Sequence, residues 1–67
     1  MKLVVNHAEE SFSEKTMTVR DLLKAKRWSF PLIIVKVNGR LVERTEYDHY
    51  RLADGDNVEL YHLVSGG

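Results

Sequence analysis

The stretch Leu32-Ile33-Ile34-Val35-Lys36-Val37-Asn38-Gly39, residues 32–39, decides the fold that the sequence predicts. Its first six residues are rich in β-branched side chains, and its last two are the pair best suited to a type I′ hairpin turn. We therefore expect a central strand that turns back into a returning strand over residues 40–43. Alternation puts the odd-numbered residues of 33–37 on the inner face, and the charge of Lys36 marks its own face, shared with Ile34, as the outer one.

Before this strand, the sequence predicts one amphipathic helix. Val19, Leu22 and Leu23 recur at spacings of three and four, so they share one apolar stripe. Thr18 can accept a hydrogen bond from an amide of the first turn, and Asp21 suits the positive end of the helix dipole. We expect a helix that starts at Thr18 and buries only this stripe.

The last part of this helix carries three basic residues, Lys24, Lys26 and Arg27. They suit the negative pole of the helix dipole, so we interpret them as a solvated helix end rather than as a binding patch. Pro31 disfavours helical geometry in the residue before it, and we therefore expect residues 28–31 to end the helix.

After the central hairpin, Asp54-Gly55-Asp56 predicts a tight turn and residues 57–63 predict a closing strand. Val58 and Leu60 alternate inward in that strand, whereas the residues that follow each of them, Glu59 and Tyr61, point outward.

Two regions give weaker signals. Residues 2–6 and 11–14 predict a first hairpin with a polar turn over residues 7–10 and a weak second strand. The polar segment 44–52 has room for a short helical turn.

This order of elements predicts the α+β class. One helix across one face of a mixed sheet is the economical way to bury one apolar stripe and one sheet face. We expect a ubiquitin-like β-grasp roll with four to five strands and one main helix. Residues 1–67 would form a single domain, with residues 64–67 as a flexible C-terminal tail.

Composition narrows the classes of function. Ten Lys and Arg balance ten Asp and Glu, which argues against a nucleic-acid partner. The chain has no Cys, which excludes disulfides, Cys-ligated metals and a cysteine nucleophile. No apolar run resembles a signal peptide or a membrane span, so we expect a cytoplasmic protein without membrane contact, monomeric when free.

The side chains offer no apparatus for catalysis. His7, His49 and His62 have no ligand-like spacing, and the carboxylates do not mark a pocket. We therefore expect no metal site, no bound cofactor and no enzymatic activity of the chain itself.

The remaining reactive group is the C-terminal carboxylate. Four residues, Val64-Ser65-Gly66-Gly67, can reach roughly 13 Å when extended, and glycine places no side chain beside the terminal carbon. If an ATP-using partner converts this carboxylate to an acyl-adenylate, the carbonyl carbon becomes open to attack by sulfur or by an amine. Two terminal glycines can also be a frayed end, but the closing strand that leads directly into them favours a functional tail.

The outer face of the predicted sheet carries Ile34, Lys36, Glu59 and Tyr61 beside this tail. We interpret this mixed patch as a partner-docking surface. The alternative is a set of exposed residues with no special role, since single exposed apolar side chains are common.

The sequence resembles the thiamin-pathway sulfur carriers of the ThiS family. The resemblance is carried by Val37-Asn38-Gly39 with Val42, Arg44 and Tyr47, then by Leu52 with Asp54-Gly55-Asp56, Val58 and Glu59, and finally by Val64-Ser65-Gly66-Gly67. It implies that an E1-like adenylyltransferase (ThiF type) uses ATP to adenylate Gly67, which then becomes a thiocarboxylate. The sulfur would pass to thiazole synthase (ThiG type). Many members of the family have glycine where Ser65 stands, and serine is small enough that we expect little effect.

Three alternatives stay open at the level of sequence. The small subunit of molybdopterin synthase (MoaD type) uses the same tail chemistry, and a role in tRNA thiolation or protein modification is a third branch of it. A β-grasp binding module of the TGS type belongs to a different class, because it has no need of a free Gly-Gly. Deleting Gly66 and Gly67 separates these classes, since only a carrier should lose its function.

Overall fold

The computed structural model describes residues 1–28 and 32–62 of the chain. The elements in chain order are β1 (Lys2–Val5), β2 (Ala8–Ser11), β3 (Met17–Thr18), α1 (Val19–Ala25), β4 (Ile33–Val37), β5 (Arg40–Val42), the 3-10 helix η1 (Arg44–Glu46), β6 (Arg51–Leu52) and β7 (Asn57–His62).

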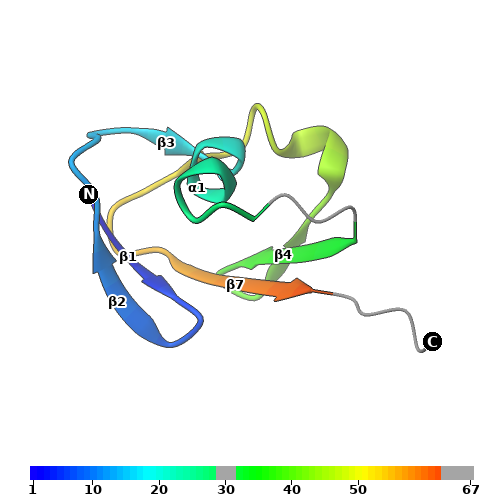
Figure 1. The fold of residues 1–67 in the computed structure, drawn as a ribbon, viewed down its shortest axis with the longest axis horizontal. Coiled ribbons are helices and arrows are strands. Elements are labelled where there is room, and N and C mark those ends of the chain that lie inside the picture. Colours follow the sequence, from blue (N-terminus) through cyan, green and yellow to red (C-terminus); the bar gives the residue numbers. More distant parts are fainter. Residues whose placement is uncertain (29–31, 63–67) are drawn as a thin grey trace.

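Five strands form one mixed sheet in the order β2-β1-β7-β4-β5, and α1 lies across one of its faces (Figure 1). The last strand, β7, occupies the centre of the sheet, parallel to β1 and antiparallel to β4. Strands β3 and β6 pair separately as a short two-stranded ribbon. The predicted β-grasp roll, with one main helix packed on a mixed sheet, is confirmed.

The core fills the space between α1 and the inner face of the sheet. The helix contributes its predicted stripe of Val19, Leu22 and Leu23, all nearly inaccessible to solvent. The sheet and the connecting segments contribute Leu3, Val5, Met17, Val35, Val37, Val42, Tyr47, Leu52, Val58 and Leu60. Burial of this apolar surface is the main term that stabilises the fold.

The start of α1 is confirmed in detail. The Thr18 side chain accepts a hydrogen bond from the Asp21 amide at 3.2 Å, and the Thr18 amide donates to Asp21 Oδ2 at 3.0 Å. This reciprocal capping box satisfies two amides that would lack partners within the helix. The hydrogen bonds to Thr18 hold the pKa of Asp21 below its ordinary value.

The prediction of the helix end was wrong. The helix ends at Ala25, before Pro31, which lies outside the described residues. Arg27 adopts a left-handed φ of 59°, its amide donates to the Lys24 carbonyl, and the Trp28 amide donates to the Leu23 carbonyl at 2.8 Å. These bonds form a Schellman motif, which satisfies the last carbonyls without help from a proline.

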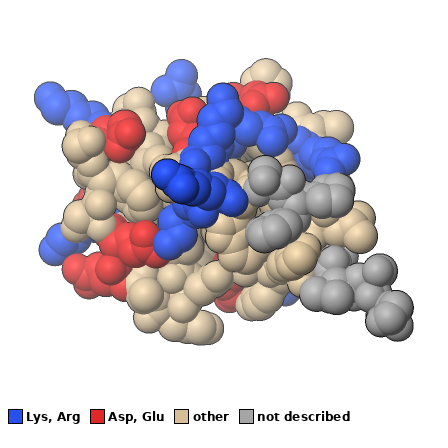
Figure 2. All heavy atoms as spheres, in the orientation of Figure 1, with Lys and Arg blue, Asp and Glu red and all other residues tan. Residues whose placement is uncertain are grey.

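The basic residues near the helix end are exposed, as the solvated-end interpretation predicts for Lys24 and Arg27. Lys and Arg side chains cover much of the surface over α1 (Figure 2). Lys26 is less exposed and forms an ion pair with Glu10 of β2 at 2.5 Å. One of the three basic residues therefore ties the helix end to the first hairpin.

The first hairpin turns earlier than predicted. Asn6 and His7 form the turn with φ values of 50° and 70°, and the second strand is Ala8–Ser11, not residues 11–14. Positive φ at both central residues matches a type I′ turn, which Asn tolerates well. The polar composition of residues 8–11 concealed the strand, because its side chains are mostly exposed.

The central hairpin has the predicted turn. Asn38 and Gly39 have φ values of 52° and 82°, and the register pairs Val37 with Arg40, Lys36 with Leu41 and Val35 with Val42. The short helical turn expected within residues 44–52 is present as η1, whereas strands β3 and β6 were not predicted.

Candidate functional site: the outer sheet face and the C-terminal residues

Gly66 and Gly67, which the sequence singles out, lie outside the described residues. The assignment of the reactive group to Gly67 therefore stays a prediction. What the structure defines is the element that precedes these residues: β7 ends at His62, and residues 63–67 follow it in the chain.

Strand β7 is held on both sides. It pairs with β4 over five residues, from Ile33 opposite His62 to Val37 opposite Val58, and with β1 at Val4 and Val5. The chain thus reaches its C-terminal residues from the central strand of the sheet rather than from an edge. A central strand moves less than an edge strand, because it has hydrogen-bonded neighbours on two sides.

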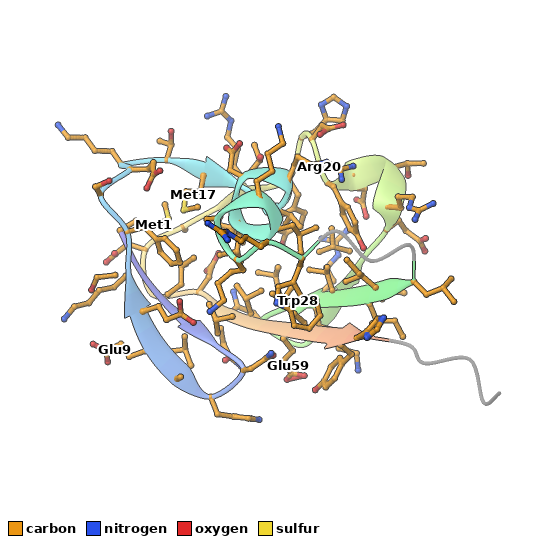
Figure 3. The ribbon with its side chains drawn as sticks, in the orientation of Figure 1. Met1, Glu9, Met17, Arg20, Trp28 and Glu59 are labelled. Carbon is orange, nitrogen blue, oxygen red and sulfur yellow. The ribbon has the colours of Figure 1, made fainter. Side chains whose placement is uncertain are left out.

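The four predicted docking residues lie together on the outer face of the sheet. Ile34 is opposite Tyr61 and Lys36 is opposite Glu59 in the register of β4 and β7. Figure 3 shows Glu59 projecting from β7 on the side of the sheet away from α1. Tyr61 is 46% exposed, and the other three are partly exposed. The structure places the patch as the alternation predicts, and docking at this patch stays a prediction.

Sequence reasoning missed one member of this surface. Leu41 of β5 is opposite Lys36, which extends the outer face by one strand, and it is 50% exposed. The two-residue turn at Asn38–Gly39 already fixes this register, so the position of Leu41 on the outer face could have been predicted from the sequence. Leu32, immediately before β4, is also 50% exposed. Among the described residues, the exposed large hydrophobic side chains are Leu32, Leu41 and Tyr61, and all three lie in or beside the β4, β5 and β7 part of the sheet.

Tyr61 and Glu59 are linked on this face. The Tyr61 hydroxyl donates to Glu59 Oε2 at 2.7 Å. This hydrogen bond raises the pKa of Tyr61 above its ordinary value of 10.0, with desolvation and the charge of Glu59 as smaller causes. The phenol is therefore neutral at physiological pH, and it presents an apolar ring with a polar tip to any partner.

The other part of the outer face has a different character. Lys2 of β1 and Glu9 of β2 form an ion pair at 3.3 Å, with both side chains 66% exposed. Val4 of β1, opposite Glu9, is partly buried. The outer face thus divides into a charged part over β1 and β2 and a mixed part over β4, β5 and β7, which carries both apolar and charged side chains.

The acidic motif before β7 is a structural turn, as predicted. Gly55 has a φ of 88°, the Lys2 amide donates to Asp54 Oδ1 at 2.6 Å, and the Ala53 amide donates to Asp56 Oδ2 at 2.8 Å. Asp56 Oδ1 also accepts from the Asn38 side chain at 3.0 Å. The two carboxylates therefore join three chain segments where β7 starts.

Within residues 1–28 and 32–62, no three His, Asp or Glu side chains lie close enough together to hold a metal ion. The same ranges contain no helix that is long and apolar enough to cross a membrane.

A five-stranded mixed sheet with one capped helix and a central last strand defines the class as a ubiquitin-like β-grasp domain. The comparison with solved structures agrees. The chain is similar to the crystal structure of the thiamine biosynthesis protein ThiS from Geobacter metallireducens, with 30% identity, full coverage of both chains and a TM-score of 0.88. An NMR solution structure of a thiamine biosynthesis protein from the same organism gives a TM-score of 0.82 and covers 88% of that chain.

Sequence comparison gives the family. The model of the ThiS family matches residues 2–67, and the chain belongs to this family of sulfur carriers. It is 29% identical to the sulfur carrier protein ThiS of Bacillus subtilis over 65 residues, which covers 97% of this chain and 98% of that protein. It is also 34% identical over 67 residues to a thiazole synthase of Paramagnetospirillum magneticum, of which it spans 20%.

Proposed function

We propose that this sulfur carrier of thiamin biosynthesis holds its sulfur as a thiocarboxylate at Gly67. Membership of the ThiS family supports the proposal, because the match extends through residue 67. Composition supports it indirectly, because the chain has no Cys and therefore no thiol that could carry the sulfur instead. In this proposal the chain is a co-substrate of other enzymes and not an enzyme itself.

The chemistry has two steps. The Gly67 carboxylate attacks the α-phosphorus of ATP in an E1-like adenylyltransferase, which forms an acyl-adenylate and releases pyrophosphate. Hydrosulfide from the sulfur donor then attacks the carbonyl carbon, AMP leaves, the S–H proton passes to solvent, and a thiocarboxylate results. Glycine suits both steps, since no Cβ obstructs the attacked carbon. ATP is consumed by the partner, so the chain needs no bound cofactor.

The recipient of the sulfur is thiazole synthase in this proposal. The similarity to one fifth of a thiazole synthase chain supports this partner, since a segment like this one and a synthase occur together in that protein. We further propose that the protein acts in the cytoplasm, where ATP is available to its activating partner.

The proposed docking surface is the mixed part of the outer face, formed by Ile34, Lys36, Leu41, Glu59 and Tyr61. Two of these residues lie on β7, the strand that leads to the C-terminal residues. A partner that covers this face would have the chain end within reach, because residues 63–67 can span roughly 16 Å when extended. Protein interfaces favour aromatic side chains such as that of Tyr61 at their core and place charged side chains at a polar rim.

Mass spectrometry tests the proposal. The purified chain, incubated with ATP, a sulfur donor and an active E1-like partner, should gain about 16 Da, because one oxygen is replaced by sulfur. A chain that lacks Gly66 and Gly67 keeps all of β7 and serves as the matched control, which should fold and gain nothing. An unchanged mass of the intact chain, with the partner shown to be active on another carrier, would contradict the proposal.

Genetic complementation tests the branch. Expression of the chain should restore growth without added thiamin in a strain that lacks its sulfur carrier for thiazole formation. Rescue of molybdoenzyme activity without rescue of thiamin synthesis would assign it to the molybdopterin branch instead.

A further inference from the structure

Strand β7 extends beyond the end of its neighbour β1. The last main-chain hydrogen bond between the two strands runs from the Asn6 amide to the Val58 carbonyl at 2.9 Å. At Asn6 the chain turns away toward β2, whereas β7 continues to His62. On this side of β7, the peptide groups of Leu60 would need a partner that the main chain of β1 no longer supplies.

The Asn6 side chain supplies that partner. Its Oδ1 accepts from the Leu60 amide at 2.8 Å, and its Nδ2 donates to the Leu60 carbonyl at 3.1 Å. A carboxamide has the same donor and acceptor as a peptide group, so Asn6 extends the ladder by one rung. Asp, Ser or Leu at this position could not satisfy both groups of Leu60.

A second asparagine side chain bonds to the chain where β7 starts, to one main-chain amide and one carboxylate. Asn38 Oδ1 accepts from the Asn57 amide at 2.9 Å, and Asn38 Nδ2 donates to Asp56. Asn6 and Asn38 are both first residues of turns with positive φ, at 50° and 52°. Because β1 runs parallel to β7 and β4 runs antiparallel to it, the two turns hold opposite ends of the same strand.

We propose that Asn6 is a positioning residue for sulfur loading, because it holds the β1 side of β7 close to the end from which the C-terminal residues continue, while β4 holds the other side. This inference rests on the proposed function. Leu60 is seven residues before Gly67, so loss of the Asn6 hydrogen bonds gives the end of β7 more freedom and makes the productive placement of the reacting carboxylate less frequent. Displacement of a reacting group by about 1 Å can lower a rate on the order of a hundredfold.

Two substitutions separate the effect of the hydrogen bonds from Asn6 to Leu60, which we call the clamp, from the effect of the turn. Asn6→Gly keeps the positive φ of the turn without strain and removes both hydrogen bonds to Leu60. Asn6→Asp keeps the size of the side chain and loses only the donor to the Leu60 carbonyl. Asn38→Gly is the matched control, since it changes the same residue type at the same turn position and releases the other end of β7.

Steady-state adenylation of each variant by the E1-like partner is the test. We expect Asn6→Gly to lower kcat on the order of tenfold with KM unchanged within about twofold, because docking is intact and only the tail is misplaced. Asn6→Asp should give a smaller decrease, and it keeps the experiment decisive if Asn6→Gly weakens the hairpin. Asn38→Gly should leave kcat near the wild-type value.

Amide hydrogen exchange provides the structural readout. The Leu60 amide should lose protection by at least about tenfold in Asn6→Gly and keep it in Asn38→Gly. A wild-type kcat in both Asn6 variants, or an equal decrease in Asn38→Gly, would overturn the positioning role. Failure of the wild-type chain to be adenylated at all would contradict the proposed function instead, while the Leu60 exchange would still test the clamp.

Discussion

The two faces of strand β7 carry side chains with different roles. Val58 and Leu60 on the inner face are 0% and 2% exposed, whereas Tyr61 on the outer face is 46% exposed. The inner residues therefore contribute to the free energy of unfolding, whereas the outer ones lie on the proposed docking surface. Substitutions one residue apart should separate stability from recognition.

Leu60→Ala should have the largest effect on stability. Truncating a buried leucine removes apolar contacts and leaves a cavity, which costs about 2–5 kcal/mol. For a 67-residue domain this is a large part of the total stability. Urea unfolding followed by circular dichroism measures the loss. The matched control is Tyr61→Ala, which should change the free energy of unfolding by less than about 1 kcal/mol; equal losses would mean that the two faces are not distinct.

Affinity for partners should depend on the outer face and not on the inner one. Ile34→Ala and Tyr61→Ala should each weaken binding to the E1-like partner or to thiazole synthase by about 1–2 kcal/mol, because anchor side chains carry most of the binding energy of an interface. Calorimetric titration of the folded variants measures the affinity.

The charged part of the outer face provides the control for recognition. Lys2→Ala breaks an exposed ion pair with Glu9, which contributes about 0–1 kcal/mol to stability, and it should leave both affinities unchanged. A loss of affinity in Lys2→Ala as large as in Tyr61→Ala would move the docking surface to β1 and β2.

Removal of the cap of α1, the helix that covers the inner face, should lower the stability less than Leu60→Ala does. Thr18→Ala removes the hydrogen bond to the Asp21 amide and should cost about 1 kcal/mol without affecting partner affinity. Because the pKa of Asp21 is lowered in the folded state, its contribution is present above its unfolded pKa and is lost as pH falls through the lowered value. Thr18→Ala keeps the Thr18 amide, which is the main donor to the Asp21 carboxylate, so the wild type and the variant should both lose stability over this pH range. A variant whose stability does not fall there would contradict this cap.

The smallest effect concerns the titration of Tyr61. Its pKa is raised in the folded state, so its hydrogen bond to Glu59 contributes to stability below the ordinary pKa of 10.0 and is lost as pH rises through the raised value. Glu59→Gln removes the carboxylate, and the phenol should then ionise at a lower pH in an ultraviolet titration. An unchanged titration curve would show that the two side chains do not interact in solution.

The sequence predicted the elements that have strong periodicity or a defined turn. The strand over residues 33–37, the turn at Asn38–Gly39 and the helix start at Thr18 each have a local signal that the structure reproduces. The alternation of β4 and β7 also placed the four docking residues on one face.

The errors arose where tertiary contacts override local signals. The β3 and β6 strands have two residues each, too few to show a period, and they form only because they pair with each other. The helix ended early because Arg27 adopts a left-handed conformation that sequence rules expect from glycine. The clamp of Asn6 on Leu60 joins residues 54 positions apart, so no local pattern could reveal it.

Delivery of sulfur from Gly67 to thiazole synthase is the step that we propose for this chain. A chain loaded with isotopically labelled sulfur at Gly67, incubated with the synthase and its other substrates, tests this directly. We expect the label to enter the thiazole product while the chain returns to its unloaded mass, a decrease of about 16 Da for unlabelled sulfur. Label that stays on the chain, or a product whose sulfur is unlabelled, would contradict it.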